Sequence, residues 1–453
     1  MMQTIDPSTG KKIKFYPQTK ISQVDDILNN AQKSFHTWRL TPFKERAFLM
    51  KEAGRILRAK EKQYAELMAQ EMGKPIFQGK GEIEKCAALC DFYADYAESF
   101  LCDRPIKTEA HKSFITYDPL GIILAVMPWN FPFWQVFRCA VPTLMAGNAV
   151  VLKHASNVCG SALAIESVFK EAGFPSALFS NVFVPSEKVK YLIEHPLIQA
   201  VSLTGSTGAG KSIAINAGGV LKKVVLELGG SDPYIILEDA DLQNAVTKCV
   251  ESRMINGGQS CISAKRFIVV ASQFKKFEEK FVSRMQLQRM GNPLYEGVDL
   301  GPLARHDLRD GLHAQVKMSL KQGARLLLGG QVPKDKGAYY PPTVLTHVRA
   351  GMSAYKEELF GPVASLIKVR DEKQAIEVAN DTVFGLGSAI FSGDLERAER
   401  LAHELQAGCC FINDFVKSDM RLPFGGIKGS GYGRELGEAG IKEFVNMKTV
   451  YIK

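Results

Sequence analysis

The sequence predicts an α/β protein of two domains, each built around a mainly parallel sheet. Short β-rich runs alternate with helical segments in two successive series, one between about residues 112 and 228 and one after residue 261, as in chains of βαβ units. The length of 453 residues, with 46% hydrophobic and 23% charged residues, is enough to bury more than one core.

Residues 22–100 precede the first series and are predicted to be helical. Their apolar residues recur at spacings of three and four, and Gly and Pro close the segment that ends at residue 75. Cys86 and Cys90 share one helical face in this region, and we interpret that face as core packing.

The strands of the first series are expected in KSFITYDPLGIILAVMPWN, AVVLKHAS, AVSLTGSTGAG and KKVVLELGG. The second series contains AKRFIVV, a helix near residues 273–287, ARLLLGG, ASLIKVR, GSAIFSG and AGCCFIND, with helices over DEKQAIEVAND and DLERAERLAHEL. We place the domain boundary near Gly229. Residues 1–111 and 122–228 then form the first domain and residues 229–420 the second.

Bulk properties exclude several classes of function. The net charge of +9 comes from Lys and Arg spread along the chain, so no nucleic acid is expected as a partner. The longest apolar runs are shorter than the ~20 residues of a membrane helix, and the first residues do not read as a secretory signal. The nine cysteines form no C-x-x-C pair, so we expect no metal site, no disulfide framework and a cytoplasmic location.

A glycine-rich turn raises one alternative function. Residues 204–212 read TGSTGAGKS and match the P-loop pattern G-x-x-x-x-G-K-[ST] from Gly205 to Ser212, which would make the protein an ATPase. Acidic residues within 234–241 would then hold magnesium. However, any glycine-rich turn at a helix N-terminus can bind phosphate, and an ATPase leaves MPWNFPFW, LELGG, GGQSC and EELFGPV without a role.

Three residues in those stretches are candidates for catalysis. Cys261 stands among glycines and small polar residues in NGGQSCISAKR, whereas a structural cysteine would have apolar neighbours. Asn130 ends an apolar run in PWNFPFW and is either a turn residue or a hydrogen-bond donor to an oxyanion. Glu227 ends an apolar strand before Gly229 and Gly230, and is either a solvent-facing glutamate or a partly buried general base.

Together these stretches resemble the aldehyde dehydrogenase superfamily, from DPSTGK near the start to FGGIKGSGYGRELG near the end. Within it, WNFPFWQVFR, GQSCISAKRFIV and FGGIKGSGYGRELG are most similar to bacterial succinate-semialdehyde dehydrogenases. The resemblance implies a Rossmann-like cofactor domain, an α/β catalytic domain and a small β element. It also places Lys211 and Ser212 on variable helix positions, which makes the P-loop match a coincidence.

The family's mechanism follows by resemblance. The Cys261 thiolate attacks the aldehyde, and the Asn130 amide and the Cys261 backbone N–H stabilise the oxyanion. Hydride transfer to NAD or NADP leaves a thioester, which water hydrolyses with Glu227 as general base. Relatives that pass the acyl group to coenzyme A usually lack this glutamate, so a free acid is the expected product.

The cofactor contacts are also implied by the resemblance. Lys153 matches the lysine on the adenosine ribose and Glu358 the glutamate on the nicotinamide ribose. Ser156 stands where many NAD-preferring relatives carry an acid, so NADP should be tolerated as well as NAD. The remaining implied contacts are Trp129, Gly205, Ser206, Gly210 and Phe360.

For the substrate, the resemblance points to succinate semialdehyde. Arg138 falls where semialdehyde-oxidising members carry an arginine for the distal carboxylate, although a surface or intersubunit role is an alternative. A second arginine of some members is replaced here by Ile255, and Lys417 or Arg421 could supply the missing charge. An uncharged aliphatic or aromatic aldehyde therefore stays an alternative substrate, and a scaffold on a decayed fold is disfavoured by the intact motifs.

The β element of the resemblance would combine residues 112–121 with residues 435–453. An exposed C-terminal strand invites pairing with a second subunit, so we expect a homodimer or homotetramer.

Overall fold

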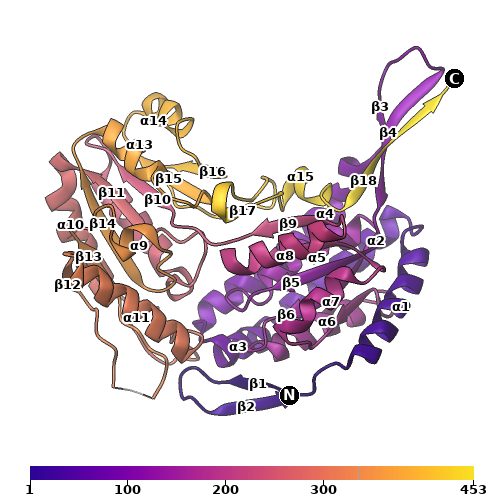
Figure 1. The fold of residues 1–453 in the computed structure, drawn as a ribbon, viewed down its shortest axis with the longest axis horizontal. Helices are drawn as coiled ribbons and strands as arrows, with labels where there is room; N and C mark the ends of the chain where they lie inside the picture. Colours follow the sequence, from indigo (N-terminus) through magenta and orange to yellow (C-terminus); the bar gives the residue numbers. More distant parts are fainter. Residues whose placement is uncertain (335) are drawn as a thin grey trace.

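The computed structural model describes residues 1–334 and 336–453, which fold into two α/β bodies and two small antiparallel sheets (Figure 1). The predicted α/β class is confirmed. Within the described residues, no helix combines the length and the apolar character needed to cross a membrane.

The first large sheet has six strands in the order β17-β9-β8-β5-β6-β7. The strands β5 to β9 run parallel, and β17 pairs antiparallel with β9. The strands are β5 (Ile122–Met127), β6 (Ala149–His154), β7 (Phe179–Asn181), β8 (Ile198–Thr204), β9 (Lys223–Glu227) and β17 (Gly431–Tyr432). The connecting helices are α5 (Trp134–Met145), α6 (Cys159–Glu171), α7 (Val189–Glu194) and α8 (Thr207–Gly219).

Four N-terminal helices extend this body, as the apolar spacing predicted. They are α1 (Ile21–Trp38), α2 (Phe43–Ala59), α3 (Glu61–Met72) and α4 (Ile76–Leu101), and they follow a hairpin of β1 (Met2–Ile5) and β2 (Lys12–Tyr16). Helix α4 packs against α2, α3 and α5. Cys86 and Cys90 on α4 are fully buried in the core.

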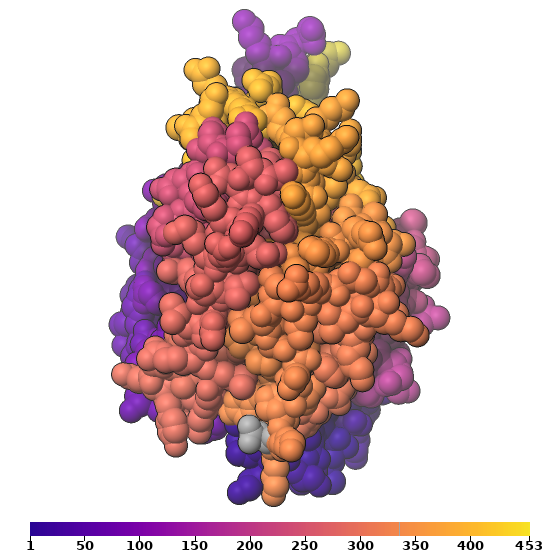
Figure 2. Space-filling model, turned by 90° about the vertical axis from the view of Figure 1, so that its left-hand side faces the viewer, coloured from indigo at the N-terminus to yellow at the C-terminus, as the bar shows by residue number. Residues whose placement is uncertain are grey.

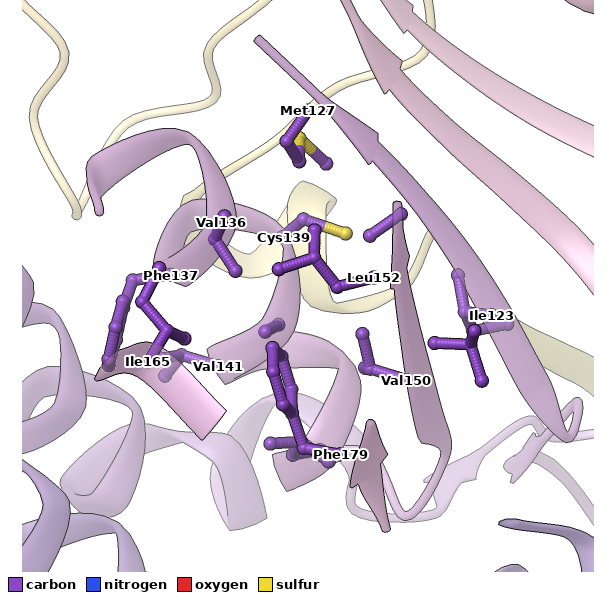
Figure 3. Close-up of a cluster of buried hydrophobic side chains, with 14 of the residues drawn as sticks. Ile123, Met127, Val136, Phe137, Cys139, Val141, Val150, Leu152, Ile165 and Phe179 are labelled. Carbon is purple, nitrogen blue, oxygen red and sulfur yellow. The ribbon is translucent and has the colours of Figure 1, made fainter. Parts of the chain in front are cut away.

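Apolar side chains fill the space between the first sheet and its helices. Figure 3 shows Ile123 and Met127 of β5 and Val150 and Leu152 of β6 facing Val136, Phe137, Cys139 and Val141 of α5, with Ile165 of α6 and Phe179 of β7 beside them. The stiff β-branched residues fit the buried strands, and each such side chain contributes roughly 1.5–3 kcal/mol when fully buried.

The second large sheet has seven strands in the order β12-β13-β14-β11-β10-β15-β16, and β12 pairs antiparallel with β13. They are β10 (Pro233–Ile236), β11 (Arg266–Val270), β12 (Arg325–Leu328), β13 (Thr343–Thr346), β14 (Val363–Val369), β15 (Gly387–Phe391) and β16 (Cys409–Ile412). Its helices are α9 (Leu242–Met254), α10 (Ala271–Gln286), α11 (His306–Lys321), α12 (Ser353–Lys356), α13 (Glu372–Asn380) and α14 (Leu395–Ala402). Figure 2 looks onto this body, coloured pink to orange.

A three-stranded antiparallel sheet projects from the two bodies at the C-terminus (Figure 1). It follows α15 (Gly437–Ile441) and consists of β18 (Val445–Ile452), β4 (Lys112–Pro119) and β3 (Arg104–Pro105). The whole of β18 pairs with β4, from Val445 opposite Pro119 to Ile452 opposite Lys112. Residues 112–119 and 445–452, which lie within the two segments of the predicted β element, pair in this sheet, whereas α15 lies before it.

Candidate active site

The carboxyl ends of the parallel strands in the first sheet carry four predicted site residues. Asn130 follows β5, Lys153 lies near the end of β6, Gly205 follows β8, and Glu227 is the last residue of β9. Because parallel strands end at the same edge of a sheet, the fold gathers these segments where open α/β sheets bind ligands.

The loop that carries Cys261 is shaped by a short left-handed segment. Helix α9 gives way to Asn256, Gly257 and Gly258, whose φ angles are +54°, +63° and +74°. A Cβ on Gly258 would lie 2.2 Å from the carbonyl oxygen of Gly361, so only glycine fits this close approach. After this segment Cys261 packs, partly buried, against the hydrophobic core of the first body.

Lys265 binds the backbone of the same loop. Its side chain is buried, and its Nζ donates to the carbonyl oxygens of Ser260 (3.1 Å), Cys261 (2.7 Å) and Ser263 (3.1 Å). Nζ also lies 3.5 Å from a carboxylate oxygen of Glu358. One buried cation therefore links the Cys261 loop to a predicted cofactor residue.

The Asn130 side chain lies beside the Cys261 loop. Its Nδ2 donates to the carbonyl oxygen of Gln259 at 3.0 Å. Asn256 in turn donates from Nδ2 to the carbonyl oxygens of Asn130 (2.7 Å) and Gln259 (3.1 Å). The amide of Asn130 keeps a second N–H, which is the donor that an oxyanion on a ligand of Cys261 would use.

The Glu227 carboxylate is buried, with an exposed fraction of 1%, and both its oxygens lack a hydrogen-bond partner among the described residues. Burial raises the pKa of Glu227 well above its usual range, and the nearby Arg138 guanidinium partly opposes this shift. A carboxyl group with these properties holds a proton readily and has free lone pairs for a ligand or a water molecule.

Cys261 is half-buried at the edge of the hydrophobic core. Burial raises the pKa of Cys261 to about 12, while the positive charges of Arg138 and Lys265 act in the opposite direction. In this arrangement the sulfur is a thiol at neutral pH, so it needs a base or a change in its surroundings to become a nucleophile.

Arg138 lies in α5 and is almost fully buried. Its Nε forms an ion pair with Glu435, its Nη2 donates to Thr204 Oγ1 at 3.3 Å, and its guanidinium lies 4.7 Å from the centre of the Phe424 ring. The guanidinium therefore already has a carboxylate partner within the protein.

A cavity of about 480 Å³ opens beside Cys261. Its wall comes from α4, α5, the end of α9 and residues 415–424, and it is largely apolar, with Phe77, Phe131, Trp134, Phe415 and Phe424 among its lining residues. Arg138, Ile255 and Lys417 also line it, whereas Arg421 is exposed, pairs with Asp419 and is not among the lining residues. This size suits a small organic molecule.

The predicted cofactor residues lie outside that cavity lining. Glu358 Oε1 accepts a hydrogen bond from the Gly230 backbone N–H at 3.0 Å, and the rings of Trp129 and Phe360 meet edge to face at 5.8 Å. Lys153 is half-buried, and Ser156 is exposed.

The glycine-rich turn opens helix α8. Ser206 is its N-cap and accepts from the Ala209 backbone N–H at 3.3 Å. A Cβ on Gly210 would lie 2.5 Å from Leu228, so this glycine allows α8 to pack closely against the segment after Glu227. Lys211 is exposed to solvent. The turn offers free backbone N–H groups at a helix N-terminus without an acidic residue in the first turn, which suits a phosphate.

Four residues around the site were not found from the sequence: Lys85, Asn256, Lys265 and Glu435. Lys85 lies on the long helix α4 and Glu435 in a loop 297 positions after its partner Arg138, so local patterns carry no signal for either. Asn256 and Lys265 lie close to Cys261 in the sequence, and this position is the signal that could have identified them.

Comparisons with known proteins agree with this geometry. The model of the aldehyde dehydrogenase family matches residues 1–450. A probable succinate-semialdehyde dehydrogenase [NADP(+)] of Synechocystis is 48% identical, with 99% of each chain covered. The succinate semialdehyde dehydrogenase [NAD(P)+] Sad of Escherichia coli K12 is 46% identical, with 99% of this chain and 97% of the relative covered.

Among solved structures, the succinic semialdehyde dehydrogenase of Streptococcus pyogenes in complex with NADP+ has a TM-score of 0.98 at 38% identity, with both chains fully covered. These matches confirm the resemblance identified from the motifs. They also leave the P-loop match in residues 205–212 as a coincidence of sequence.

Proposed function

Since the chain belongs to the aldehyde dehydrogenase family, we propose that it oxidises succinate semialdehyde to succinate with NAD or NADP. The observation that carries the reaction is that Cys261 lines the cavity while the buried, unpartnered carboxylate of Glu227 lies near enough for its charge to act on the Cys261 thiol. The named activities of full-length relatives at 46–48% identity support the substrate.

The residues of the chain divide the chemistry as follows. Cys261 gives up its proton to a water molecule in the cavity and adds to the aldehyde carbon as the thiolate. The free N–H of the Asn130 amide stabilises the oxyanion of the resulting thiohemiacetal. Glu227, which has both oxygens free, acts in its ionised form and takes the proton from the water that hydrolyses the thioester; its raised pKa makes it a stronger base for that step. The released product is then a carboxylic acid and not a coenzyme A ester.

The cofactor fits residues that are already in place. Backbone N–H groups at the start of α8 suit the pyrophosphate, Lys153 and Ser156 the adenosine ribose, and Glu358 the nicotinamide ribose. When bound, NAD(P)+ supplies the two-electron oxidation by accepting a hydride. Because Ser156 places no negative charge near the ribose 2′ position, either cofactor can bind. The Trp129 and Phe360 pair would border the same site.

An uncharged aldehyde is the second candidate substrate. The aromatic side chains in the cavity wall favour apolar ligands, and the one arginine assigned to the substrate carboxylate, Arg138, is paired with Glu435. A comparison of succinate semialdehyde with hexanal and benzaldehyde, under each cofactor, separates the two candidates by kcat/KM.

The Glu227→Gln variant tests the mechanism. Without the base, we expect a burst of one NAD(P)H per active site followed by a steady state at least ~100-fold slower than in the wild type, because thioester formation continues and hydrolysis stalls. Cys261→Ala should show neither phase. An unchanged steady state for Glu227→Gln would contradict the assignment of the base.

We also propose that two or four copies assemble through the three-stranded sheet. Strand β18 is an edge strand with exposed Met447, Tyr451 and Ile452, which an isolated chain would leave in water. Light scattering of the full chain and of a chain ending before Val445 would test this assembly. We place the enzyme in the cytoplasm, in keeping with its nine free cysteines.

A further inference from the structure

We propose that Lys85, on helix α4, binds the distal carboxylate of the substrate. This inference rests on the proposed oxidation of succinate semialdehyde and names the residue that would select it. Lys85 lines the same cavity as Cys261, so one ligand in that cavity meets both side chains.

The charges around the cavity single out Lys85. Six charged residues line it, and five of them have an ion-pair partner within the protein. The pairs are Glu82 with Lys74, Arg138 with Glu435, Glu251 with Lys248, Asp299 with Arg289, and Lys417 with Asp414. Among the described residues, no carboxylate lies within ion-pair distance of the Lys85 ammonium.

The surroundings of Lys85 hold its ammonium group in place. Nζ donates to Ser418 Oγ at 2.6 Å and lies 4.1 Å from the centre of the Trp134 ring. Since Ser418 accepts this bond, its own O–H stays free to donate. An ammonium and a hydroxyl thus stand side by side in a half-buried, apolar wall, which is a suitable pair of donors for a carboxylate.

The electrostatics of Lys85 also favour an anionic ligand. Burial and the nearby Arg138 guanidinium lower the pKa of Lys85 to about 8. The ammonium is therefore mostly charged at neutral pH but lacks a counter-charge, and an incoming carboxylate would supply one.

Arg138 is less suited to the same task. Its exposed fraction is 2%, and a ligand that took its guanidinium away from Glu435 would leave that carboxylate buried and unpaired. Breaking a buried pair in this way is costly. Lys85 would exchange only a hydroxyl contact for a charged one.

The Lys85→Met variant tests the proposal, because methionine keeps the apolar stem against Trp134 and removes the charge. We expect kcat/KM for succinate semialdehyde to fall about 10- to 100-fold, mainly because KM rises. A loss of this size is usual when a hydrogen bond to a charged group is removed. With pentanal, an uncharged aldehyde of similar length, kcat/KM should stay within about twofold. Lys85→Arg should recover part of the lost activity.

Lys80→Met is the matched control, because this lysine lies on the same helix α4, pairs with Glu296 and is not among the residues that line the cavity. It should leave kcat/KM for both aldehydes within about twofold of the wild type. Equal losses for both aldehydes in Lys85→Met would show a structural role and overturn the proposal. An unchanged preference of Lys85→Met for succinate semialdehyde over pentanal would also overturn the proposal.

A binding measurement separates this proposal from the function on which it rests. Succinate should slow the alkylation of Cys261 by iodoacetamide in the cofactor-free wild type, and about 10-fold more succinate should be needed in Lys85→Met. If the wild type does not prefer succinate semialdehyde but shows this protection, the proposed function fails and the anion site stands. If protection by succinate is equal in the two proteins, the anion site fails.

Discussion

Replacing Gly258 by alanine should push the loop that carries Cys261 away from the segment that carries Glu358. Gly258 has a φ angle of +74°, and its added Cβ would lie 2.2 Å from the Gly361 oxygen and 2.4 Å from the Gly361 carbon. Both obstacles are backbone atoms, so no side chain can rotate away. Gly258 stands three residues before Cys261, and Gly361 three residues after Glu358.

The size of the effect follows from these distances. Contacts of Cβ atoms below 3.0 Å essentially never occur, so the 2.2 Å contact must open by at least about 0.8 Å. A misplacement of about 1 Å between reacting groups costs roughly 100-fold in rate. The left-handed backbone adds about 1–2 kcal/mol of strain for alanine. We therefore expect kcat/KM to fall about 100-fold, together with a lower thermal stability.

The assay is the initial rate of NAD(P)H formation, measured beside a thermal unfolding scan. Gly311→Ala is the matched control, because a Cβ at this exposed position in α11 meets no atom within 4 Å and lies outside the site. That variant should retain its activity within about twofold. A Gly258→Ala enzyme with more than a third of the wild-type kcat/KM would refute the reasoning, since it would show that the two segments can separate without cost.

Three further outcomes are expected. Because burial raises the pKa of Cys261 to about 12, its thiolate fraction grows with pH, so the rate of alkylation by iodoacetamide in the cofactor-free enzyme should rise about tenfold per unit between pH 7 and pH 10; a plateau below pH 9 would contradict this. Asn130→Ala should lower kcat/KM by at least ~100-fold by removing an oxyanion donor, and a loss below tenfold would rule out that role. Ser156→Glu should lower kcat/KM with NADP by more than tenfold and leave that with NAD within about threefold, because a carboxylate repels the 2′-phosphate; equal losses would place Ser156 away from the ribose.

Much of the fold could be predicted because its signals are local. Apolar runs between glycines mark the buried strands, such as β11 in AKRFIVV, and the amphipathic spacing before residue 100 marks the helical region, which the structure divides into four helices. The short β3 and β17 were not predicted. Each contains only two residues, too few for a periodic pattern, and each is a strand only because a distant neighbour pairs with it.

The site was predictable where chemistry and local sequence coincide. Cys261 stands out because small residues surround it, and Glu227 because a strand of apolar residues ends there. The ion pair of Arg138 with Glu435 was not predictable, since it joins residues far apart in the chain. Lys85 reads as an ordinary charged residue on a helix, and only the packing of α4 beside α5 turns it towards the cavity.

The wall of the cavity is assembled from segments that the chain makes independently. Helix α4 supplies Lys85 and Phe77, whereas the loop after α9 supplies Cys261. Selection on the cavity face of α4 can therefore exchange one aldehyde for another while the reactive loop is inherited unchanged. The cavity face of α4 and the Cys261 loop can therefore vary independently of each other. A mutagenesis library confined to α4 is the most direct way to obtain new substrate preferences.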